Sequence, residues 1–217
     1  MLLLSLSACS QYKEWQLIEI NDLLSKEKYH EVLPIIKKEL SKDSTDLLLL
    51  QAGVEAYTMT ASFNNAIFLA KKMIEIDSNN NYAYTFASLN YYSKKNYDSA
   101  LIFVNRAIDN KTAGRFVIHK NPEIYPFDEN ILYLKFLRAT YNTDGKTNLK
   151  QVKLDIDELF EKNYDPMEMT LLRGNFYGTI GKLDEACVDF KEAKKLGNPD
   201  ADWYIDRYCK NQQLNEN

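Results

Sequence analysis

The chain has 217 residues, and its 27 Lys and Arg against 31 Asp and Glu give a net charge of −4. Because the basic residues form no long cluster that could neutralise a phosphate backbone, we expect no nucleic-acid partner. A content of 45% hydrophobic and 27% charged residues is typical of a globular protein, and only 7 Gly and 5 Pro favour long helices.

The N-terminus reads MLLLSLSACS, an apolar run that ends in Leu6-Ser7-Ala8-Cys9 before the sequence turns polar. The run is far shorter than the roughly 20 residues of a membrane-spanning helix, and no Lys or Arg precedes it. The four residues resemble a bacterial lipobox, which implies that residues 1–9 are a signal-peptide remnant and that Cys9 is lipidated. Two or more acyl chains hold a protein at a membrane. We therefore expect a membrane-anchored protein of the bacterial envelope, at the periplasmic or surface face of the outer membrane. The alternative is an apolar start with a chance Cys.

A repeat with a period of 34 residues runs through the rest of the chain. Val32, Ala66 and Ala100 are spaced by 34, and so are Val152 and Ala186. An aromatic residue or Leu stands three residues before each of them. The step from Ala100 to Val152 is 52, so an insertion of 18 residues, at about 110–128, interrupts the array. Such a period is typical of stacked helical hairpins, and it predicts five of them.

The last repeat shows which family the hairpins resemble. Gly174 and Tyr177, the run Gly181–Ala186, and then Phe190 and Ala193, resemble a tetratricopeptide repeat (TPR). The resemblance implies an all-α, right-handed superhelix over residues 12–213, and the closing stretch is similar to lipoproteins of this family from the Bacteroidetes lineage. Apolar residues also recur at helical spacing, which agrees with an array of helical hairpins.

Signals for helix ends fall where hairpins should turn. Breaks are expected at 77–81, at Asp165-Pro166 and at 197–199, with Asp165 as an N-cap. Residues 201–213 predict one further helix, a cap for the end of the array.

No residue pattern predicts catalysis. His30 and His119 have no partners at metal-ligand spacing, and the sequence contains no phosphate loop and no nucleophile elbow. We interpret Asp155, Asp157, Glu158 and Glu161 as the solvated face of a helix. The sequence therefore predicts a protein that is not an enzyme and that has no cofactor and no metal.

The TPR resemblance implies that the first helix of each hairpin lines a concave groove. The mixture of Tyr, Leu, Asn and Gln expected there suits a protein or peptide partner. Carried over repeat by repeat, the predicted groove residues are Gln51, Glu55, Thr58, Tyr82, Thr85, Leu89, Tyr92, Lys135, Asn142 and Asn175. The alternative for each is an ordinary solvated or inter-helix residue.

Two cysteines near the C-terminus are candidates for a disulfide. Cys187 and Cys209 lie symmetrically about residue 198, so antiparallel helices that turn there would carry the two thiols at the same height. An oxidising compartment, as lipidation of Cys9 implies, would permit the bond. The alternative is two small packing residues that never pair.

The leading prediction is a lipid-anchored envelope scaffold that binds a protein or peptide. One alternative is a lipoprotein that binds a small ligand, such as a glycan or peptidoglycan fragment, under the insertion. Another is a subunit of an outer-membrane assembly or secretion machine. The apolar residues of the insertion predict that it packs on the solenoid.

Overall fold

A computed structural model describes residues 16–110 and 127–209, which are helical without any strand. The contacts divide the chain between Phe127 and Asp128 into two compact units, each treated below by itself. Cys9, almost all of the insertion, His119 and residues 210–213 of the predicted terminal helix lie outside the described residues.

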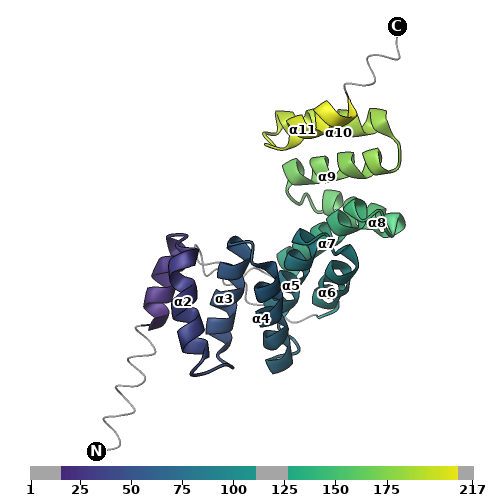
Figure 1. Ribbon diagram of the computed structural model, residues 1–217. Helices are drawn as coiled ribbons and strands as arrows, with labels where there is room; N and C mark the ends of the chain where they lie inside the picture. Colours follow the sequence, from purple (N-terminus) through teal and green to yellow (C-terminus); the bar gives the residue numbers. More distant parts are fainter. Residues whose placement is uncertain (1–15, 111–126, 210–217) are drawn as a thin grey trace, which may run out of the picture. The chain divides into compact units, whose positions relative to one another are not determined.

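The first unit is a run of antiparallel helices in chain order (Figure 1). Residues 16–25 are helical. They are followed by α2 (Tyr29–Leu40), α3 (Leu47–Met59), α4 (Phe63–Ile76), α5 (Asn81–Ser93) and α6 (Tyr97–Asp109). Residues 16–25 with α2, α3 with α4, and α5 with α6 form the first three hairpins.

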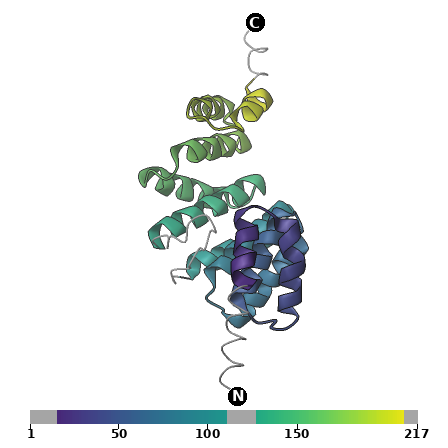
Figure 2. The same cartoon turned by 90° about the vertical axis from the view of Figure 1, so that its left-hand side faces the viewer.

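The second unit continues the same pattern. Its helices are α7 (Phe127–Asp144), α8 (Leu149–Glu161), α9 (Pro166–Thr179), α10 (Leu183–Lys195) and α11 (Ala201–Tyr208). Figure 2 shows them, coloured from green to yellow, lying one after another. They give two more hairpins and a terminal helix, so the predicted all-α superhelix of about five hairpins is confirmed in the described residues.

Small residues at the helix crossings allow each hairpin to pack closely. Val32, Ala66, Ala100, Val152 and Ala186, the residues that define the repeat, are all 0% exposed. A helix pair packs closest where neither helix carries a large side chain at the contact, so a buried Ala or Val here sets the hairpin geometry. The period read from the sequence is therefore the period of the core.

The turns inside these hairpins share one backbone conformation. Glu27, Ala61, Lys95 and Gly181 each stand five residues before the repeat's small residue, and each has a positive φ, between 54° and 81°. A residue in this left-handed region ends the first helix and starts the turn. The turn between α7 and α8 differs, because it has four residues, 145–148, where the turns 60–62, 94–96 and 180–182 have three.

The predicted breaks at 77–81 and at Asp165-Pro166 are confirmed, whereas the terminal helix ends at Tyr208, with Cys209 in a turn, and so is shorter than predicted. Helix α4 ends at Ile76 before α5 begins at Asn81, and α9 begins at Pro166. The Asp165 carboxylate accepts the backbone N–H of Glu168 at 3.2 Å, which makes it the N-cap of α9.

Two hairpins of the second unit contain an ion pair between their facing helices. Arg138 donates from Nε and Nη2 to the two carboxylate oxygens of Asp155, at 2.8 and 2.6 Å. Arg173 makes the same two bonds to Asp189, at 2.8 and 2.7 Å, and its guanidinium lies 4.2 Å from the centre of the Phe160 ring. Arg173 thus has a partner in the facing helix of its hairpin.

The interpretation of Asp155 as part of a solvated face was wrong. Asp155 is only 1% exposed, whereas its neighbours Asp157 and Glu161 are exposed. The sequence did not show that Arg138 would face it from α7, and that partner is what permits a carboxylate in the core.

Removing the buried carboxylate should be costly. We expect Asp155→Ala to lower the free energy of unfolding by about 3 kcal/mol, because Arg138 would keep its charge in a mostly buried site. The measurement is urea unfolding followed by circular dichroism. The matched control on the same helix is Asp157→Ala, which removes an exposed pair with Lys153 and should change stability by less than about 0.5 kcal/mol. Equal losses in the two variants would contradict the assignment.

Candidate functional site

The first helices of the hairpins in the first unit carry the predicted groove residues. On α3, Gln51 and Glu55 are half-buried, and Leu48 and Met59, near its two ends, are 56% and 59% exposed. On α5, Leu89 and Tyr92 are half-buried. The first-helix face of this unit is therefore apolar at its margins and polar along α3.

Tyr82 and Thr85 are a correction to the predicted groove. They are 4% and 0% exposed, so a partner cannot reach them. The Tyr82 hydroxyl donates to the Gln51 carbonyl at 3.3 Å and its ring stacks on Phe86 with centroids 4.3 Å apart, while Thr85 donates to the Asn81 carbonyl. Burial first, and then the charge of Glu55, raises the pKa of Tyr82 well above its ordinary value. These two residues stabilise the stack of helices.

Thr58 has a similar structural part to play. Its hydroxyl donates to the Val54 carbonyl at 2.7 Å and accepts from the Asn90 amide at 2.8 Å. Asn90 is 0% exposed and lies on α5, so the bond joins the two first helices. Thr58 stays at the surface, but its hydroxyl is already engaged.

The predicted groove positions on α7 were shifted by one residue. Lys135 forms an ion pair with Glu158 of α8, so it faces the partner helix of its own hairpin. Asn142 is 3% exposed, donates to the Arg138 carbonyl and accepts from the Thr147 hydroxyl. The prediction took these residues 17 and 10 positions before Val152, two more than in the other hairpins, and the four-residue turn after α7 accounts for only one of those two.

Counting back from the end of α7, as the other first helices are counted, gives the residues at the equivalent positions of this helix. They are Tyr133, Phe136 and Thr140, all half-buried. The ring of Phe136 lies 6.1 Å from that of Tyr164, centre to centre. Sequence reasoning missed this set, and Met59 as well. The signal that would have found them is the helix end, because α3, α5 and α9 are each separated from the next helix by a three-residue turn.

Asn175 is placed on the predicted face of α9. It is half-buried, and its amide donates to the Asp144 carboxylate of α7 at 3.0 Å. Near the start of the same helix, Glu168 accepts from the Asn198 amide at 3.3 Å. Burial, with the charges of Asp165 and Asp200, raises the pKa of Glu168.

Aromatic side chains of α11 close the end of the second unit. The Tyr204 and Tyr208 rings lie 4.9 and 5.6 Å from the Phe190 ring, centre to centre. Burial, followed by the charge of Asp144, raises the pKa of Tyr204 to about 12. Tyr208 also covers Gly178, since a Cβ there would meet its ring at 3.2 Å. The terminal helix thus covers the apolar end of the last hairpin, as the sequence predicted for a cap.

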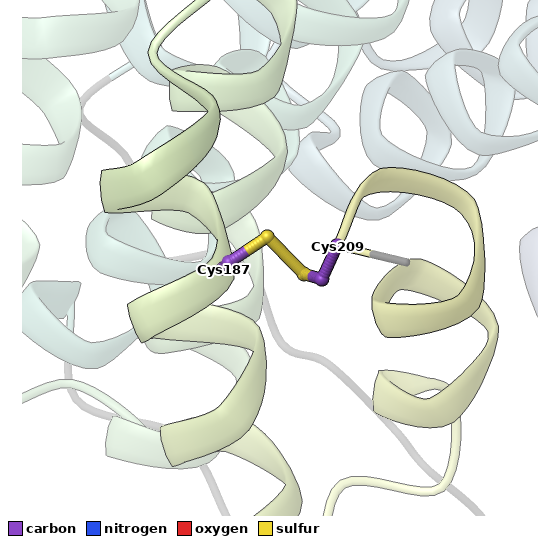
Figure 3. Close-up of a disulfide and its surroundings, with 2 residues drawn as sticks. All are labelled: Cys187 and Cys209. Atoms are coloured by element: carbon purple, nitrogen blue, oxygen red, sulfur yellow. A yellow bond between two sulfur atoms is a disulfide. The ribbon is translucent and has the colours of Figure 1, made fainter. Parts of the chain in front are cut away.

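A disulfide holds the terminal helix in place. Figure 3 shows Cys187 of α10 bonded to Cys209, which ends α11. Their Cα atoms are 5.6 Å apart, within the range that a disulfide spans. The two residues are 4% and 9% exposed, and they join the cluster around Phe190. Of the two alternatives for these cysteines, the structure has the bonded one.

Loss of this bond should loosen the end of the second unit. We expect Cys209→Ser, or reduction, to lower the free energy of unfolding by about 3 kcal/mol, because the bond closes a loop of roughly 20 residues in the unfolded chain. Thermal unfolding with and without reductant measures the loss, and a non-reducing peptide map of protein exported to the periplasm shows the bond. Two free thiols in that map, or a melting temperature that reductant does not change, would contradict the prediction.

Two further features are absent from the described residues. Within residues 16–110 and 127–209, no group of His, Cys, Asp and Glu is arranged to hold a metal ion. No helix of these ranges has the length and apolar character needed to cross a bilayer.

Comparison with known proteins bears on the fold. No protein-family model matches the chain, and no curated protein matches it. Among solved structures, MamA is similar with a TM-score of 0.63 and 18% identity, over 86% of this chain and 93% of that chain. YrrB, a TPR protein with an unusual peptide-binding site, is similar with a TM-score of 0.65 and 14% identity, over 88% and 90%. The chain has the fold of the TPR proteins. At these identities the likeness extends to the fold alone.

Proposed function

We propose that this chain is a lipid-anchored scaffold of the bacterial envelope that binds a protein or peptide through the first-helix face of its hairpins. The observation that supports it most is the surface of α3 and α5. There, Leu48 and Met59 are exposed and Leu89 and Tyr92 are half-buried, on the helices that also carry the polar Gln51. Exposed apolar anchors on helices that also carry polar side chains suit a peptide chain.

The location in the envelope has separate support. The Leu6-Ser7-Ala8-Cys9 sequence resembles a lipobox, and a disulfide joins Cys187 to Cys209. Disulfides persist in oxidising compartments such as the periplasm and the cell surface. A chain that is exported and acylated at Cys9 would have both features.

The binding face can be tested with a photo-crosslinking amino acid. Placed at Met59 in cells that make the protein, it should give a discrete adduct with a partner protein or peptide, because this side chain is 59% exposed beside the proposed face. The readout is a shifted band that mass spectrometry identifies.

The matched control is the same amino acid at Ile76, which is 41% exposed at the end of α4, a second helix. No adduct, or the same adduct at lower yield, is expected there. Adducts that form at Ile76 and not at Met59 would contradict the proposed face.

The anchor has its own test. In a gene that carries a complete export signal, Cys9→Ser should move the protein from the membrane fraction to the soluble fraction, because the acyl chains supply the membrane affinity. Fractionation and labelling with a radioactive fatty acid measure it, with Cys209→Ser as the control that keeps the anchor. If the variant stays in the membrane fraction, the lipoprotein part of the proposal is wrong.

A further inference from the structure

Every hairpin carries an exposed apolar residue at the same place. It stands two residues after the buried small residue, on the second helix of the hairpin. The set, called the outer row below, is Pro34, Phe68, Ile102, Leu154 and Val188. Phe68, Ile102, Leu154 and Val188 are 66%, 62%, 54% and 67% exposed.

The repetition is what needs an explanation. Single exposed apolar side chains are ordinary on protein surfaces, whereas apolar side chains gathered in one patch mark an interaction site. These residues lie on the second helices, α2, α4, α6, α8 and α10, so they belong to a face other than the one proposed for peptide binding. The outer row therefore calls for a partner of its own.

In the first unit the outer row is accompanied by positive charge. Residues three and four positions further along a helix share the face of the apolar residue. On α2, α4 and α6 these positions hold five cations and no carboxylate: Lys37, Lys38, Lys71, Lys72 and Arg106. Lys37 and Lys71 lean over the rings of Tyr57 and Tyr91, at 6.0 and 5.5 Å.

In the second unit the same positions are mostly acidic. On α8 they hold Asp157 and Glu158, and on α10 they hold Lys191 and Glu192. Asp157 pairs with Lys153 on the surface, and Glu192 with Lys195, whereas Glu158 pairs with the partly buried Lys135 of α7. Exposed pairs of this kind are weak in water, so the carboxylates can exchange partners at little cost.

We propose that the outer row is a self-association surface, on which the first unit of one copy packs against the second unit of another. Apolar residues then meet apolar residues, while the cations flanking Phe68 and Ile102 face the carboxylates flanking Leu154 and Val188. Each copy presents one basic and one acidic row, so each copy can supply either side of this contact. The occupant of the surface is thus a second copy of this chain, selected by charge complementarity.

The apolar part of the surface is tested first. Full-length chain with Cys9→Ser should form dimers in sedimentation equilibrium. Adding Phe68→Ser and Ile102→Ser should raise the dissociation constant roughly tenfold or more, as for the loss of buried apolar contacts at an interface. The matched control is Leu196→Ser, an exposed apolar residue outside the row, which should leave the constant unchanged.

Charge exchange tests the pairing of the two units. One variant carries Lys38→Glu, Lys72→Glu and Arg106→Glu, and the other carries Asp157→Lys and Glu192→Lys. Each alone should be monomeric, because both of its rows have the same sign. A mixture of the two should form a one-to-one dimer, because each basic row then meets an acidic one. Melting curves close to that of the parent chain show that the variants are folded.

Three results would overturn the proposal. The parent chain could stay monomeric at every concentration, the two charge variants could fail to associate when mixed, or the serine substitutions could leave the dissociation constant unchanged. A monomer that instead sediments with phosphatidylglycerol vesicles, and not with phosphatidylcholine vesicles, would assign the basic row to a membrane surface.

Discussion

The close crossing of the two helices in each hairpin is the constraint on which the other features depend. Val32, Ala66, Ala100, Val152 and Ala186 stand at these crossings and are fully buried. The remaining contacts are equally tight. A Cβ at Gly53 would lie 2.6 Å from a Leu69 methyl group, and one at Gly174 would lie 2.6 Å from the Phe190 ring. Once each hairpin closes in this way, its apolar faces are buried only by stacking on the next hairpin.

Apolar contacts join the facing helices in both units, and the second unit adds ion pairs to them. In the hairpin of α3 and α4, Gly53 meets Leu69, an apolar contact without direction. In the hairpins of the second unit, Arg138 donates two hydrogen bonds to Asp155, and Arg173 donates two to Asp189. A bidentate pair has one favourable geometry, so it sets the register of the two helices more strictly than apolar packing does. The second unit therefore combines ion-pair registers with a disulfide at its end.

Packing also decides how much of the first-helix face is left for a partner. Tyr82 and Thr58 have groups that could bind a peptide, but the hydroxyl of each already joins α3 to α5. What is left for a partner is the exposed Leu48 and Met59 and the half-buried Tyr92, on helices that also carry polar residues such as Gln51. A surface of this kind favours an extended or helical chain with apolar anchors over a compact charged ligand.

The sequence alone determined the class of fold and the number of hairpins. A small residue every 34 positions can only be explained by a repeated close crossing, and Asp165-Pro166 places a helix start where the structure has it. For Cys187 and Cys209 the spacing predicted equal height on two helices, but not whether their side chains face each other.

Only the tertiary structure decided which first-helix residues reach solvent. One extra residue in the turn after α7 rotates that helix by about 100° relative to a simple repeat, and Lys135 forms an ion pair with Glu158 of α8. The sequence predicted a solvated Asp155, whereas in the structure its carboxylate is buried and accepts hydrogen bonds from Arg138 of α7. Periodicity describes a helix by itself, whereas burial depends on what the neighbouring helix places against it. The burial of a residue is therefore decided by side chains that can lie far away in the sequence.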